Sequence, residues 1–170
     1  MNRLVSSEYS EMIGRALYVL PDNLRARLRH VNFLTGTDPI YAGLHHYTQT
    51  AAGDSYLDVF STAFRCHTSD RSTTIILPYV NNPVYVFHEL GHALDETLGW
   101  SHTAAPVSEY AKTDRTEAFA EAFTAWQYWY GDQDALYGDE ATVRLFEDLS
   151  EIECPNGPHA LLANNGWNYG

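Results

Sequence analysis

The sequence has very little positive charge, and Lys112 is its only lysine. Its 10 Lys and Arg residues are outnumbered by 22 Asp and Glu residues, and the formal net charge is -12 at pH 7. Nucleic acids and anionic membranes attract basic surfaces, so a chain this acidic suits neither. We therefore expect no nucleic acid and no membrane among its partners.

Long apolar runs and closely spaced cysteines are also missing. No apolar run approaches the ~20 residues that cross a bilayer, and Ser, Glu and Gly interrupt the start of the chain where a signal peptide needs an apolar stretch. We therefore expect synthesis in the cytoplasm, with export by another route left open. Cys66 and Cys154 lack metal-ligand spacing, and a disulfide between them is neither required nor excluded.

What remains is an ordinary globular composition. The chain has 170 residues, of which 45% are hydrophobic and 19% charged. This length suits one domain that buries roughly 70% of its unfolded surface. Since repeats and linkers are absent from the sequence, we expect a single domain over residues 1–170. The composition does not indicate an oligomeric state.

The pattern along the chain predicts helices, then strands, then helices. Residues 1–30 look helical in two pieces, with the first over residues 7–20. Segments rich in Val, Ile, Thr and aromatic residues then predict strands; they cover residues 31–36, 43–51, 56–68 and 73–80. This order favours an α+β domain with a small mixed or antiparallel sheet. Pro78 suggests that the last of these strands lies at an edge of the sheet, where an extended substrate can pair with it.

Capping signals predict three helices after the strands. Asn81 or Asn82 can begin the first, and Gly99 can end it. Asp114 can cap the second, which we expect to end at Gly131. The third is expected over residues 139–150. Aromatic side chains near the end of the second helix are expected mostly in the core; they are Trp126, Tyr128, Trp129 and Tyr130.

The segment His88-Glu89-Leu90-Gly91-His92 is the main functional signal. Residues i and i+4 share one face of a helix, so His88 and His92 can bind the same Zn²⁺ ion. Glu89 is rotated about a quarter turn away and can act as general base toward a water on the metal. The alternative is a helix whose two histidines lie at the surface or pair with acids.

A zinc site also needs a third protein ligand. Asp95 and Leu98 stand where the metzincin pattern requires Gly and His, which excludes that class. His102 lies close by, but beyond the expected end of the helix. Glu117 and Glu121 are stronger candidates, because they share one face of the second helix. One carboxylate can bind the metal while the other hydrogen-bonds a ligand histidine.

Glu117 also has a purely structural explanation. In the segment Asp114-Arg-Thr-Glu117, it can occupy the fourth position of a capping box and reach back to the backbone of Asp114. From the residues alone, ligand and cap both stay open.

The stretch from Val84 to Phe123 resembles the catalytic domain of anthrax lethal factor and the related Pro-Pro endopeptidases. The resemblance lies in HELGHALDETLG and in a tyrosine seven residues before EAFAEAF. These proteins are gluzincin metalloproteases, which implies a zincin-like fold here. The known members are secreted or delivered toxins, whereas this sequence shows no signal peptide. Compartment and substrate are therefore not implied by the match, and a requirement for proline around the cleaved bond stays open.

Position by position, the resemblance implies a role for each matching residue. It implies zinc ligands at His88, His92 and Glu117. It implies that Glu89 is the general base and that Tyr110 is the active-site tyrosine, able to donate a hydrogen bond to the oxyanion.

The resemblance also matches the family's next acid to Glu121, which is expected to hydrogen-bond a ligand histidine. Asp95 is assigned to the same supporting role.

The sequence as a whole predicts a zinc metalloendopeptidase that cleaves a protein or peptide substrate. Two alternatives stay open. One is a zincin-like binding module in which zinc is structural, and the other is a metal-dependent hydrolase of a non-peptide amide.

Overall fold

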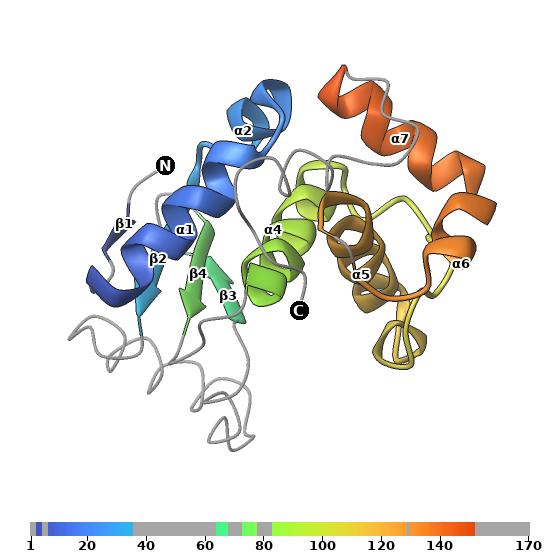
Figure 1. Cartoon of the computed structure of the whole chain (residues 1–170), viewed down its shortest axis with the longest axis horizontal. Coiled ribbons are helices and arrows are strands. Elements are labelled where there is room, and N and C mark those ends of the chain that lie inside the picture. The colour runs from blue at the N-terminus through green and yellow to red at the C-terminus, as the bar shows by residue number, and fades with distance from the viewer. Residues whose placement is uncertain are drawn as a thin grey trace.

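The computed structural model describes residues 3–4, 7–35, 64–67, 73–77, 83–128 and 130–151, and these are mostly helical. In chain order the elements are β1 (Arg3–Leu4), α1 (Ser7–Val19), α2 (Asp22–Arg27), β2 (Val31–Thr35), β3 (Phe64–His67), β4 (Thr73–Leu77), α4 (Pro83–Thr97), the 3-10 turn η2 (Tyr110–Lys112), α5 (Arg115–Gln127), α6 (Gln133–Gly138) and α7 (Glu140–Ser150). Figure 1 shows the strands gathered beside α1 and α4, with α5, α6 and α7 beyond α4. From α1 onward, the order of helices, strands and helices follows the sequence-based expectation, but β1, which precedes α1, was not expected.

The described strands form one mixed sheet in the order β1-β2-β4-β3. β2 is parallel to both β1 and β4, while β3 is antiparallel to β4. Phe33 of β2 pairs with Ile75 of β4, and both side chains are fully buried. The apolar centre of the sheet is therefore covered.

The expectation of an edge strand at residues 73–80 is wrong. β4 lies between β2 and β3, so its neighbours use the backbone groups on both of its sides. A substrate therefore cannot extend the sheet at β4. Pro78, which suggested the edge, lies outside the described residues, as does the strand expected over residues 43–51.

The helices follow their capping signals closely. Gly99, with φ of +70°, lies just beyond the end of α4, and this left-handed conformation favours glycine at helix ends. Asp114 caps α5, and Asp139 caps α7. α5 ends at Gln127 rather than Gly131, and the expected caps Asn81 and Asn82 lie outside the described residues. Among the helices described, none is both long enough and apolar enough to cross a membrane.

The core surrounds α4 and α5, which are buried on nearly all sides. α4 packs closely on α5 and also contacts α1 and β4. From α7, Phe146 enters the same core, where its ring centroid lies 5.4–5.6 Å from those of Phe119, Phe123 and Trp126. Trp126 and Tyr128 are buried, which confirms their predicted place in the core. Tyr130 is half-buried, and Trp129 lies outside the described residues.

Candidate metal centre

α4 presents His88 and His92 on one face. Their ring centroids are 4.8 Å apart and the rings are nearly perpendicular, with an interplanar angle of 86°. The two Nε2 atoms lie 3.1 Å from each other. The spacing of four residues therefore turns the same atom of both rings toward one point, as a shared metal requires.

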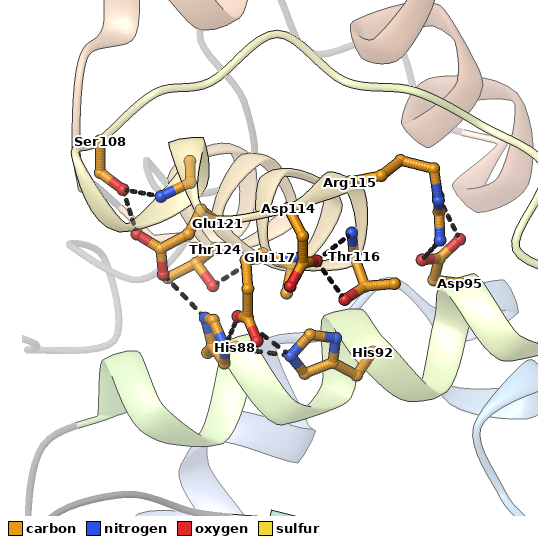
Figure 2. Close-up of polar contacts among 12 residues, drawn as sticks. His88, His92, Asp95, Ser108, Asp114, Arg115, Thr116, Glu117, Glu121 and Thr124 are labelled. Carbon is orange, nitrogen blue, oxygen red and sulfur yellow. Dashed lines mark hydrogen bonds and ion pairs between the residues drawn. The ribbon is translucent and has the colours of Figure 1, made fainter.

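α5 brings Glu117 to this point from the opposite side (Figure 2). Asp114 caps the helix by accepting hydrogen bonds from the backbone N–H groups of Thr116 and Glu117. Glu117 Oε2 lies 3.0 Å from His88 Nε2 and 3.3 Å from His92 Nε2. The Asp114 half of the expected capping interaction is thus present, while the carboxylate of Glu117 is directed to the imidazoles.

Gly91 allows the two helices to approach each other. A Cβ atom at this position would lie 2.8 Å from the Cα atom of Ala120 in α5, which is closer than real Cβ contacts come. A side chain here would therefore push the helices apart. The glycine within the HELGH segment sets the distance between the histidines and Glu117.

The three converging atoms fit a zinc ion. Ligand atoms at the corners of a tetrahedron with bonds of about 2.0–2.1 Å lie about 3.3 Å apart. The three separations here, 3.0, 3.1 and 3.3 Å, are close to that value. Glu117 Oε2 is buried, and it faces both Nε2 atoms. Two imidazoles and one carboxylate are also ligands that zinc commonly takes, and together they form a possible metal-binding group.

Glu121, also on α5, contacts the candidate ligand group, which consists of His88, His92 and Glu117 and is called the ligand group below. Its Oε1 atom lies 2.7 Å from His88 Nδ1, which leaves Nε2 of the same ring to face Glu117. Its Oε2 atom accepts a hydrogen bond of 2.6 Å from Ser108 Oγ. Burial works to raise the pKa of Glu121, but hydrogen bonds from His88, Ser108 and Tyr130 outweigh it and lower the pKa. The expected contact between Glu121 and a ligand histidine is therefore present.

Without a metal, His88 and Glu117 strongly shift each other's pKa values. Burial works to lower the pKa of His88, but its contacts with Glu117 and Glu121 outweigh burial and raise the pKa to about 10. Burial works to raise the pKa of Glu117, but the neighbouring His88 and His92 lower it to about 2. At neutral pH, metal-free His88 is thus a positively charged imidazolium, and its two ring N–H groups face the carboxylates of Glu117 and Glu121. A metal that binds here must displace one of these ring protons.

Tyr110 and Glu89 lie at the same site. The ring centroid of Tyr110 is 5.8 Å from that of His88, and the side chain is 52% exposed. Burial, followed by the negative charges of Glu117 and Glu89, raises the pKa of Tyr110 to about 12, so the phenol keeps its proton and can donate it in a hydrogen bond. The charge of Glu89 also raises the pKa of His88. A protonated phenol and a carboxylate therefore both border the ligand group.

Two other sequence candidates have different partners. Asp95 is fully buried and forms an ion pair with Arg115, whose Nη2 atom lies 2.6 Å from Asp95 Oδ2. Arg115 also donates to the carbonyl of His102. Asp95 therefore ties the end of α4 to the start of α5 instead of holding a ligand ring. His102 Nε2 is 2.7 Å from Thr142 Oγ1 and its ring packs on Phe119, so His102 contacts α7 and α5 rather than the ligand group.

Sequence reasoning missed Ser108 and Tyr130, the two hydroxyl groups that contact Glu121. They lie 13 residues before it and 9 residues after it, in segments without a recognisable motif. The sequence feature that comes nearest to indicating these two contacts is Gly131, which has φ of +64°. It lies so close to Val107 that a Cβ atom would be 2.7 Å from the Val107 carbonyl oxygen. This close crossing brings the segments that carry Ser108 and Tyr130 together.

Comparisons of the chain with family models, with curated proteins and with solved structures give no match. Function must therefore be inferred from the side chains themselves.

Proposed function

We propose that the chain is a zinc metallopeptidase of the gluzincin type with a zincin-like fold. Its zinc would be held by His88, His92 and Glu117. The observation that carries the proposal is the meeting of two Nε2 atoms and the buried Glu117 Oε2 atom at 3.0–3.3 Å from one another. The two histidines do pair with acids, His88 with Glu117 and Glu121 and His92 with Glu117. A solvated helix face or a capping interaction does not account for three ligand atoms that converge on one point.

The ligand geometry supports zinc better than a harder cation. Mg²⁺ and Ca²⁺ prefer six or more oxygen ligands, whereas two imidazole nitrogens and one carboxylate suit a tetrahedral zinc site with one open position. When bound, zinc acts as a Lewis acid that makes water a nucleophile near neutral pH and polarises a carbonyl group.

The remaining residues at the site have the roles that peptide hydrolysis requires. Glu89 takes the proton of the attacking water and delivers it to the leaving amine. Tyr110 donates a hydrogen bond to the oxygen of the cleaved carbonyl as negative charge develops there. A pKa of about 12 suits this role, because the phenol stays protonated throughout the neutral range. Glu121 holds the ring of His88 through Nδ1.

The substrate we propose is a protein or peptide chain. A purely structural zinc would not require a carboxylate at Glu89 or a phenol at Tyr110 beside the ligands, so their presence favours an enzyme. Hydrolysis of a non-peptide amide needs the same groups, and substrate profiling separates it from proteolysis.

The test is cleavage of a peptide library by the zinc-loaded protein, read by mass spectrometry. We expect cleavage by the wild type, loss after chelation, and recovery when zinc is returned. Glu89→Gln should keep zinc and lose activity by at least the ~10²–10⁴-fold that general acid–base catalysis contributes.

Equal cleavage by Glu89→Gln would contradict the proposed mechanism. Stoichiometric zinc without cleavage of any peptide would instead favour the structural or the non-peptide alternative.

A further inference from the structure

Ser108 lies between the ligand group and the turn that carries Tyr110, and its hydroxyl contacts both. Ser108 Oγ donates a hydrogen bond of 2.6 Å to Glu121 Oε2 and accepts one of 3.0 Å from the backbone N–H of Ala111. Ala111 follows Tyr110 directly in η2. Glu121 in turn holds His88 Nδ1 through its other oxygen (Figure 2). A continuous chain of hydrogen bonds thus runs from His88 to the backbone of the Tyr110 turn.

The hydroxyl of Ser108 both donates and accepts a hydrogen bond in this series. A serine hydroxyl has one proton to donate and lone pairs that accept. The hydroxyl donates a hydrogen bond to the carboxylate of Glu121, a residue that is only 2% exposed. It accepts a hydrogen bond from the backbone N–H of Ala111, which is equally buried. Removal of the hydroxyl would leave a buried oxygen and a buried N–H group without this partner, and buried polar groups are costly to leave unpaired.

We propose that Ser108 is a positioning residue that couples the ligand group to the Tyr110 turn. A metal that fixes His88 would then also fix the place of the phenol. The coupling itself depends on the hydrogen bonds alone. Only its effect on turnover rests on the proposed function, through the role given there to Tyr110. Ser108 works through Glu121 and Ala111, not on the substrate.

Two variants of Ser108 and one control variant distinguish the effect of losing the hydroxyl from the effect of changing the size of the side chain. Ser108→Ala removes the hydroxyl, and Ser108→Thr keeps it while adding a methyl group, which a half-buried position can accept. Ser150→Ala is the matched control, because Ser150 Oγ is a buried serine hydroxyl that donates to the Phe146 carbonyl within α7, away from the ligand group.

The first measurement is hydrogen exchange of the Ala111 amide with and without saturating zinc. It reads local opening and needs no catalytic activity. In the wild type we expect zinc to slow this exchange at least ~10-fold if the ligand group and the turn are coupled. Ser108→Ala should exchange faster and lose the response to zinc, while Ser108→Thr and Ser150→Ala should respond as the wild type does.

The second measurement compares zinc affinity and turnover. Supporting residues around a metal site typically contribute 10–100-fold to affinity, so Ser108→Ala should weaken zinc binding about 10-fold. At saturating zinc, it should lower kcat about 10-fold with little change in KM, since one oxyanion donor is misplaced. In a Tyr110→Phe background, the same change should alter kcat less than about twofold, because residues acting through one another are not additive.

The coupling would be overturned if zinc changed the exchange rate of the Ala111 amide equally in the wild type and in Ser108→Ala. Independent, multiplying effects of Ser108→Ala and Tyr110→Phe on kcat would overturn the route through Tyr110. A zinc-loaded wild type that cleaves no peptide would contradict the proposed function, while the exchange measurement would still decide whether Ser108 couples the two parts.

Discussion

Glu117 shows how one residue can serve two demands of the structure. Its backbone N–H is satisfied by the Asp114 cap, as at the start of many helices. Its side chain turns away from the cap, and Oε2 reaches His88 and His92. The sequence predicted both roles as alternatives, because capping depends on neighbours in the chain. The contact with the imidazoles depends on how α4 and α5 pack, which no local pattern contains.

Glu117→Ala should weaken zinc binding strongly. Loss of one of three protein ligands removes a metal bond, and Kd should rise by more than the 10–100-fold that supporting residues contribute. The measurement is zinc affinity by competition with a chelator of known strength. His102→Ala is the control, because His102 binds Thr142 instead of the ligand group. Full affinity in Glu117→Ala together with a loss in His102→Ala would mean that the ligand assignment is wrong.

Stability of the metal-free protein should depend on pH through His88 and Glu117. The pKa of His88 is raised from 6.5 to about 10, so its contribution is complete below 6.5 and is lost as pH rises toward 10. The pKa of Glu117 is lowered from 4.5 to about 2, so its contribution is complete above 4.5 and is lost as pH falls toward 2. The pair should therefore stabilise most between pH 4.5 and 6.5.

Urea unfolding of the metal-free protein at pH 6 and pH 9.5 measures this effect. The free energy of unfolding should fall by up to about 4 kcal/mol between these values, because the raised pKa of His88 spans nearly all of this range and one pKa unit corresponds to about 1.4 kcal/mol. His88→Gln should flatten the dependence. An unchanged slope in that variant would assign the pH effect to other groups.

Local signals explain which elements could be predicted. α4, α5 and α7 were expected because a capping residue or a terminal glycine frames each apolar run. α6 was missed, since six residues carry too little periodicity to recognise. The position of β4 was predicted wrongly because strand order is also decided by its pairing with β2, which is distant in the chain.

The crossing of α4 and α5 at Gly91 should be sensitive to a single methyl group. Gly91→Ala would place Cβ 2.8 Å from Ala120 Cα, so the helices must separate and the histidines must move from Glu117. We expect a loss of about 1–3 kcal/mol in unfolding free energy, the usual cost of overpacking. Zinc affinity should fall in the same variant.

Gly138→Ala is the control for that substitution. A Cβ atom there meets nothing within 4 Å, and the residue ends a short helix, so stability and zinc affinity should stay close to wild type. If Gly91→Ala behaved like Gly138→Ala in both measurements, close helix packing would not set the geometry of the site.

In the molecule as a whole, the candidate ligand group lies on α4 and α5, two helices whose side chains are mostly buried. Packing around α4 and α5 holds their backbones, as precise sites require. The segment between them is tied down as well. Arg115 joins Asp95 to the carbonyl of His102, and Asp139 at the start of α7 accepts a hydrogen bond from the Ala105 N–H group. Sequence patterns indicated the motif residues, whereas these long-range ties needed the fold.

The central claim is that His88, His92 and Glu117 hold a zinc ion. X-ray absorption at the zinc edge of the loaded protein tests it most directly, because the spectrum reports the identity and distance of the atoms bound to the metal. We expect one zinc per chain with nitrogen and oxygen ligands at about 2.0–2.1 Å, two of them imidazoles. A sulfur ligand at about 2.3 Å would contradict this assignment, since only Cys66, Cys154 or a methionine could supply it. A protein that takes up no zinc at all would contradict it as well.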